Sequence, residues 1–232
     1  MHEIEENMSV SVIQENGKSS PDDVCKKFGV EYFVPGKSAI SGSRENDLYT
    51  YTTYIGPHTV AVEKGDCVYY YDNKGVAHVQ SGPVKIQSTV IATVIRGYTP
   101  PTRSVVVGRS THLPYINGCS TRQIFTPERI GDPTLQLLHM PPHASEQEHH
   151  IHSTARIVHV LEGHGRCVVG MDKWQGVQEL TPGMSLVLHP MCPHHFETDD
   201  ESLLVLPLHI YSSPPSGIEH NHPMFNGTHR IG

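Results

Sequence analysis

Two histidines separated by a single residue are the first feature of this 232-residue sequence that could do chemistry. His150 and His152 stand directly before an apolar, β-branched run at residues 157–161, which predicts a strand. Residues two apart on a β-strand point to the same face, so the two imidazoles would lie side by side. Imidazole is a good ligand for several transition metals. The pair therefore predicts part of a metal site.

A second histidine pair, His194 and His195, lies further along the chain. It follows a turn at Gly183, a short apolar run that predicts a strand, and a proline-rich turn. One imidazole from this pair would complete a set of three neutral ligands. Such a set leaves the far side of a metal open and its positive charge intact, which favours anionic substrates.

At these residues the sequence resembles the cupin superfamily, over residues 134–212. The first cupin motif is H-x-H, three or four residues, Glu, six residues, Gly, and His150, His152 and Gly163 stand at this spacing. The second motif is Gly, five residues, Pro, one residue, Gly, two residues, His. Gly183 matches its start. The resemblance implies a jelly-roll β-barrel with converging inward side chains.

Two departures from the motifs matter. Arg156 takes the position of the first motif's glutamate, and because arginine cannot bind a cation, the resemblance implies a three-histidine site. His189 and Met191 replace the proline and the second glycine of the second motif, so that turn is unusual. His194 matches the motif histidine, whereas His195 and His189 are the substitutes if His194 fails.

Arg156 shares the parity of the two ligand histidines and should point into the barrel. A buried arginine needs a partner. Two alternatives are open: bidentate binding of a substrate carboxylate, or an internal salt bridge to Glu148 or another acid. Three alternatives are open for Glu148: a fourth metal ligand, a general base, or an exposed residue before the strand begins. We favour the exposed residue. His159 has the opposite parity and should face away from the metal.

Composition excludes several classes of protein. The chain has 17 basic and 24 acidic residues, a net charge of −7, and no basic cluster, which argues against nucleic-acid binding. No apolar run approaches the ~18 residues that a membrane span needs. The N-terminus resembles no signal peptide, and five scattered cysteines without C-x-x-C suggest reduced thiols. We therefore expect a cytoplasmic protein.

High glycine and proline content and little helical periodicity predict an all-β fold. An edge strand at 8–13 and a short helix from Ser20 to about Phe28 are predicted near the N-terminus. Strands are predicted at Tyr49–Tyr54, Val60–Val62, Cys67–Tyr71, Val84–Arg96 and Ser104–Val107. These strands form either a degenerate first cupin barrel or extra strands on a single barrel.

The predicted organisation has five parts. They are an N-terminal strand and helix (1–30), a β-rich half (31–107), a loop-rich linker (108–133), the metal-binding barrel (134–212) and a His-rich tail (213–232). His220 and His222 of the tail are read as surface residues, with a second metal site as the alternative. We also expect a homodimer that pairs through N-terminal strands, because open sheet edges need covering.

The resemblance implies a metal-dependent enzyme, and the missing glutamate favours a three-histidine iron dioxygenase. Its metal would be Fe(II), with Mn, Ni, Cu or Zn as alternatives, bound by His150, His152 and His194. The partners would be O2 and a small anionic substrate anchored by Arg156. The alternatives are an isomerase or lyase that uses the metal as a Lewis acid, and a non-catalytic binding protein, because the fold alone does not choose.

Overall fold

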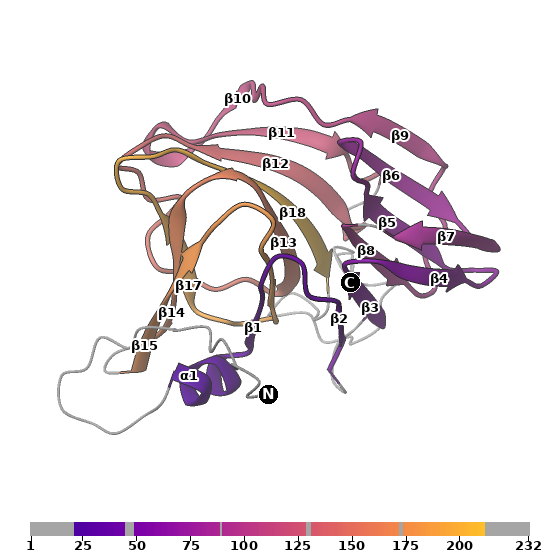
Figure 1. Cartoon of the computed structure of the whole chain (residues 1–232), viewed down its shortest axis with the longest axis horizontal. Helices are drawn as coiled ribbons and strands as arrows, with labels where there is room; N and C mark the ends of the chain where they lie inside the picture. Colours follow the sequence, from indigo (N-terminus) through magenta and orange to yellow (C-terminus); the bar gives the residue numbers. More distant parts are fainter. Residues whose placement is uncertain (1–20, 45–48, 89, 129–130, 172–173, 212–232) are drawn as a thin grey trace, which may run out of the picture.

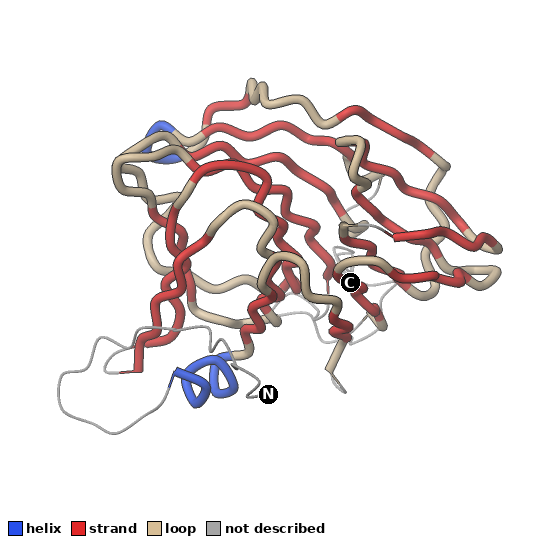
Figure 2. Tube along the Cα trace, in the orientation of Figure 1, coloured by secondary structure: helices blue, strands red, loops and turns tan. Residues whose placement is uncertain are grey.

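The computed structural model describes residues 21–44, 49–88, 90–128, 131–171 and 174–211. Strands dominate this part of the chain (Figure 2). The predicted all-β, jelly-roll class is thereby confirmed. The predicted strand at 8–13 and the tail histidines His220 and His222 lie outside the described residues. None of the described helices is long and apolar enough to cross a bilayer.

The second half of the chain, together with one strand from near the N-terminus, forms two sheets that curve around a common interior (Figure 1). In sheet order, the larger sheet contains β1 (Val30–Phe33), β16 (Ser185–Leu188), β13 (Thr154–Gly163), β18 (Leu203–Tyr211), β12 (Thr134–Met140), β11 (Ser120–Phe125) and β10 (Leu113–Pro114). The smaller sheet contains β15 (Trp174–Leu180), β14 (Gly165–Met171) and β17 (His194–Glu197). We call these two sheets the C-terminal barrel.

The first half forms a six-stranded and a two-stranded sheet, which together we call the N-terminal layer (Figure 1). In sheet order, the larger contains β2 (Ala39–Gly42), β3 (Tyr51–Ile55), β8 (Ile91–Ile95), β5 (Cys67–Tyr71), β6 (Val76–Ser81) and β9 (Arg103–Val106). The smaller pairs β4 (His58–Val62) with β7 (Val84–Ser88).

Strand β13 lies between these two regions and explains how they pack. Its residues alternate, so Val158 and Val160 belong to the core inside the barrel. Ala155 and Ile157 belong instead to a second core, which packs the barrel against residues of the N-terminal layer such as Tyr69. Both faces of this strand are therefore buried.

The helix α1 (Pro21–Phe28) agrees with its prediction. Proline suits the first helical position, and Gly29 ends the helix in the left-handed region at φ +74°. Val24 is fully buried in the barrel core, and the Lys27 ammonium lies 4.1 Å from the Trp174 ring. The helix thus packs on the barrel beside β14 and β15.

Two sequence predictions need correction. Val84–Arg96 is not one strand: β7 belongs to the two-stranded sheet, whereas β8 lies inside the six-stranded sheet and is buried along its whole length. The segment 108–133 is not merely a linker, because β11 pairs with β12 and widens the barrel sheet, and η1 (Ile116–Gly118) adds a 3-10 turn. The division of the chain into units stays a prediction.

Candidate metal centre

The structure brings His150, His152 and His194 together, with ligand atoms that all lie within 4.8 Å of one another. His150 and His152 do not stand in a regular strand as predicted, because they precede the start of β13 at Thr154. His150 instead forms an isolated bridge with His194, exchanging backbone hydrogen bonds of 3.1 and 2.9 Å. The ligand segment therefore crosses from the larger to the smaller barrel sheet.

The alternation of β17 decides between the two adjacent histidines. His194 is 1% exposed and lies in the cluster. His195 bonds instead to His149, with 2.8 Å between their Nδ1 atoms. The third histidine of the cluster is thus His194, and His195 and His149 form a separate pair.

His189, the other substitute, lies away from the cluster. Its Nε2 is 2.9 Å from Glu31 Oε1, and its Nδ1 is 3.5 Å from the Tyr51 hydroxyl. Met191, at the position of the motif's second glycine, has a φ of +64°, a left-handed conformation that glycine adopts readily. Its N–H donates to the His152 carbonyl oxygen at 2.7 Å, so the turn supports a ligand segment.

Backbone carbonyls fix the tautomers of two of the cluster histidines. His150 Nδ1 lies 2.7 Å from the Glu148 carbonyl oxygen, and His194 Nδ1 lies 2.8 Å from that of Cys192. A carbonyl oxygen can only accept, so in the neutral rings Nδ1 carries the proton and Nε2 carries the lone pair. This is how metal-ligating histidines are commonly oriented.

The Nε2 atoms fit the dimensions of a metal site. Those of His150 and His152 lie 2.6 Å apart, and that of His194 is buried with no hydrogen-bond partner among the described residues. Neighbouring ligands at bond lengths of about 2.1 Å and right angles are ~3 Å apart. Small ring movements would therefore bring all three nitrogens to such a geometry.

The histidines are also in the protonation state that a metal needs. Burial is the main cause, and the charge of Arg156 a further cause, of a pKa of about 2 for His152 and about 3 for His194. The pKa of His150 is lowered as well, chiefly by burial. All three rings are neutral near pH 7 and available as ligands.

A cavity of about 380 Å³ lies inside the barrel next to the cluster. Arg156 lines it, as its parity predicted, together with Phe196, whose ring centroid is 6.0 Å from that of His194. Glu148 is exposed, as favoured from the sequence, and its backbone serves His150. Arg156 is thus placed where a small molecule beside the cluster would meet it.

Two cavity residues escaped the sequence analysis. Glu146 is 3% exposed, and burial raises the pKa of its carboxyl while the Arg156 charge lowers it. His209 stands opposite Arg156 in the β13–β18 pairing, and burial holds its pKa well below the usual range. Even parity with His150 was the available signal for Glu146, and the inward alternation of β18 was the signal for His209.

Comparison with known families bears on the same segment. The family profile described as a cupin domain matches residues 136–211. This segment is a cupin domain. Among curated proteins, none matches the sequence.

Several solved structures are similar to this chain, and one of them resembles it beyond the cupin domain. A protein described as glyoxylate-induced, from Pseudomonas aeruginosa, superposes with a TM-score of 0.52 at 11% identity, covering 75% of this chain and 79% of its own. A cupin 2 conserved barrel domain protein from Leptotrichia buccalis gives 0.43 at 13%, covering 77% and 91%. Momordica charantia 7S globulin gives 0.46 at 11%, covering 78% and 84%.

At such identities the likeness concerns the fold alone. The match to the Pseudomonas protein covers more of the chain than the cupin domain can account for, so it extends into the N-terminal layer. The chain therefore combines a cupin domain, a three-histidine cluster that could hold a metal, and further β-structure packed against it.

Proposed function

We propose that this protein is a metal-dependent cupin enzyme, a three-histidine non-heme iron dioxygenase that acts on a small organic acid. The supporting observation is the buried Nε2 of His194, which has no partner among the described residues and lies within 4.8 Å of two further imidazole nitrogens. An orphaned buried nitrogen costs free energy, which a metal bond would recover.

Three neutral imidazoles suit a divalent transition metal of intermediate softness, with Fe(II) favoured and Mn, Ni, Cu or Zn as alternatives. When bound by His150, His152 and His194, Fe(II) would supply redox chemistry with O2. Among the described residues the cluster contains no acidic ligand, so a bound metal would keep its positive charge, which favours anionic substrates.

Arg156 would orient the substrate. It lines the cavity beside the cluster, and its charge reaches all three histidines. A guanidinium binds a carboxylate through two parallel hydrogen bonds, which fixes the orientation of the acid. Glu146 shares this cavity, so a substrate carboxylate would compete with it for the arginine.

The test combines metal content with O2 uptake over a panel of small carboxylic acids and thiols. Arg156→Leu should keep its metal, because Arg156 is not a ligand. It should lose substrate affinity by about 1.5–3 kcal/mol, the scale of a charge-assisted hydrogen bond. Arg109→Leu is the matched control, since this side chain is 80% exposed and pairs with Glu162 outside the cavity.

Two results would count against the proposal. Loss of metal in Arg156→Leu would make Arg156 a structural residue. Failure of the iron-loaded protein to consume O2 with any acid or thiol would remove the dioxygenase.

One observation favours a second candidate, a metal-assisted isomerase or lyase. Glu146 is a buried carboxyl in the same cavity as Arg156, and burial raises its pKa, which makes it a candidate for the proton transfer that such a reaction needs. In this case the parent enzyme would turn over its substrate without consuming O2. Glu146→Gln would abolish this turnover and leave the metal content unchanged.

A further inference from the structure

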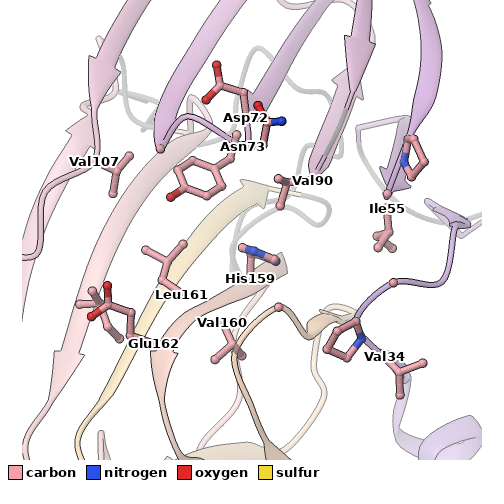
Figure 3. Close-up of a pocket in the computed structure, with 18 of the residues that line it drawn as sticks. Val34, Ile55, Asp72, Asn73, Val90, Val107, His159, Val160, Leu161 and Glu162 are labelled. Atoms are coloured by element: carbon pink, nitrogen blue, oxygen red, sulfur yellow. The ribbon is translucent and has the colours of Figure 1, made fainter.

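A second cavity, of about 420 Å³, lies where the N-terminal layer meets the outer face of the C-terminal barrel. We call it the interlayer cleft. Figure 3 shows His159 and Leu161 from β13 in its lining, with Val107 on one side, Ile55 on the other and Asp72 beyond. Its volume lies within the range of about 300–1,000 Å³ that is usual for small-molecule sites.

The interlayer cleft is separate from the candidate metal centre. Arg156 and Val158 line the cavity inside the barrel, whereas His159 and Leu161 line the cleft. The two cavities share no lining residue, and β13 separates them. A ligand could therefore occupy one without touching the other.

His159 gives the cleft a polar group within an apolar wall. Its side chain is 6% exposed, and its Nδ1 lies 2.9 Å from the Ser185 hydroxyl oxygen. The Tyr71 ring is 6.0 Å from it, centroid to centroid. Burial lowers the pKa of His159 to about 4, so the ring is neutral near pH 7 and can give or accept a hydrogen bond at Nε2.

The charged side chains at the mouth of the cleft balance one another and would attract an ionic ligand only weakly. Two are positive, on Lys37 and Arg109, and two are negative, on Asp72 and Glu162. Arg109 Nε lies 2.6 Å from a Glu162 carboxylate oxygen. Asp72 accepts backbone hydrogen bonds from residues 74 and 76 and lies 3.1 Å from His78 Nε2. Balanced charges of this kind favour an uncharged ligand.

The rest of the cleft wall consists mainly of apolar side chains and of glycine backbone. Ten of the 21 lining residues are aliphatic residues, prolines or Tyr71, and five more are glycines. A Cβ added at Gly36 would meet no atom within 4 Å, which leaves that side of the mouth open. A flat apolar molecule would bury its faces between the two layers and leave its polar group for His159.

We propose that the interlayer cleft binds an uncharged aromatic molecule with one hydroxyl or carbonyl group, which His159 recognises by a hydrogen bond. The site is independent of the metal centre and of the reaction proposed there. Because the cleft contacts both the N-terminal layer and β13, a bound ligand would stabilise the packing of the two regions.

The test is calorimetric titration of the full chain with 2-naphthol and with naphthalene-2-sulfonate, which has the same ring system and a negative charge. We expect 2-naphthol to bind and the sulfonate to bind at least tenfold more weakly. His159→Phe keeps a ring of similar shape without the hydrogen bond and should weaken 2-naphthol binding about tenfold. His164→Phe, at an exposed histidine paired with Glu201, should leave it unchanged.

Two further variants keep the test decisive. Leu161→Trp should fill the cleft and abolish binding, with circular dichroism to verify the fold. His150→Ala should bind 2-naphthol as the parent does, because it alters only the metal centre. Absence of 2-naphthol binding at millimolar concentration, equal binding in His159→Phe, or loss of binding in His150→Ala would each overturn the proposal.

Discussion

The C-terminal barrel and the N-terminal layer share one part of their pairing scheme, two successive strand pairs, and differ in their interiors. In the barrel, β13 and β14 pair with β18 and β17; in the N-terminal layer, β3 and β4 pair with β8 and β7. The scheme encloses the histidine cluster and a cavity of about 380 Å³ in the barrel. Between β8 and the β4–β7 sheet, the described residues form a cluster of buried aliphatic side chains, with Tyr54 and Tyr70 packed against it.

The difference lies in a few interior positions. β17 begins with His194, whereas β7, its counterpart in the pairing scheme, contributes Ile86 to the aliphatic cluster and has no histidine. Both strands pair through backbone hydrogen bonds, whichever side chains they carry. The fold therefore brings inward-pointing side chains together in both regions. The types of these side chains decide whether they can bind a metal.

The largest expected effect concerns the core that joins the two regions. Ile157 is 2% exposed and lies on the face of β13 that contacts the N-terminal layer. Ile157→Ala should lower the free energy of unfolding by about 2–5 kcal/mol, through lost burial and an unfilled cavity. Because the core is shared, unfolding in urea should shift equally when followed by Trp174 fluorescence and by far-UV circular dichroism.

Trp174 is the single tryptophan and lies on the barrel side, so it reports on one region alone. Two separate transitions, with only one of them shifted by Ile157→Ala, would mean that the regions unfold independently. The shared core would then be a contact surface between separate units.

A smaller effect concerns acid. The pKa of His159 is about 4 in the folded chain, against about 6.5 for an imidazole in the unfolded chain. Above pH 6.5 both states are neutral and His159 adds no pH dependence. As the pH falls from 6.5 to 4 the unfolded chain binds the proton first, so stability is lost, and below pH 4 the loss stops growing.

His159→Phe should therefore lose about 2–3 kcal/mol less stability than the parent between pH 7 and 4.5. Urea denaturation at both pH values measures this difference, with His164→Phe as the exposed control. An unchanged pH slope in His159→Phe would show that this histidine takes up its proton without unfolding.

The smallest effect concerns turns. In the N-terminal layer, Gly65 holds a left-handed position at φ +97°, whereas the barrel places Met191 at φ +64° beside the metal centre. Left-handed backbone costs a non-glycine residue about 1–2 kcal/mol, and glycine's freedom in the unfolded chain offsets part of any gain. Met191→Gly should therefore raise stability by up to about 1 kcal/mol.

Gly65→Ala should lower stability by about 1 kcal/mol, because a Cβ there meets no atom within 4 Å and only backbone strain remains. Thermal unfolding of both variants gives the comparison. A destabilised Met191→Gly would show that the Met191 side chain contributes more than its backbone costs.

Much of the barrel could be predicted from sequence because its signals are local. The apolar run at residues 157–161, which predicted a strand, lies within β13 in the structure. The spacing of His150, His152 and His194 also predicted the cluster, and parity placed Arg156 inside the barrel and His159 outside it. Alternation along a strand is a strong guide wherever both faces are buried.

The remainder depends on pairing between distant segments. Nothing local divides β7 from β8, since the residues between them are as β-branched as those within. Glu146 and His209 reach the cavity because β13, β18 and the segment before His150 converge in space. The sequence showed which residues share a face with them. It did not show which strands pair with these segments, and so it did not show that this face lines the cavity.

Metal content is the most direct test of the central claim, that the histidine cluster is the metal site. The measurement is elemental analysis of protein purified without added metal, for the parent, His150→Ala and His194→Ala. His149→Ala and His195→Ala are adjacent controls from the separate pair. We predict about one transition-metal ion per chain in the parent and both controls, and little in the two cluster variants. Full metal content in His150→Ala and His194→Ala would contradict the account.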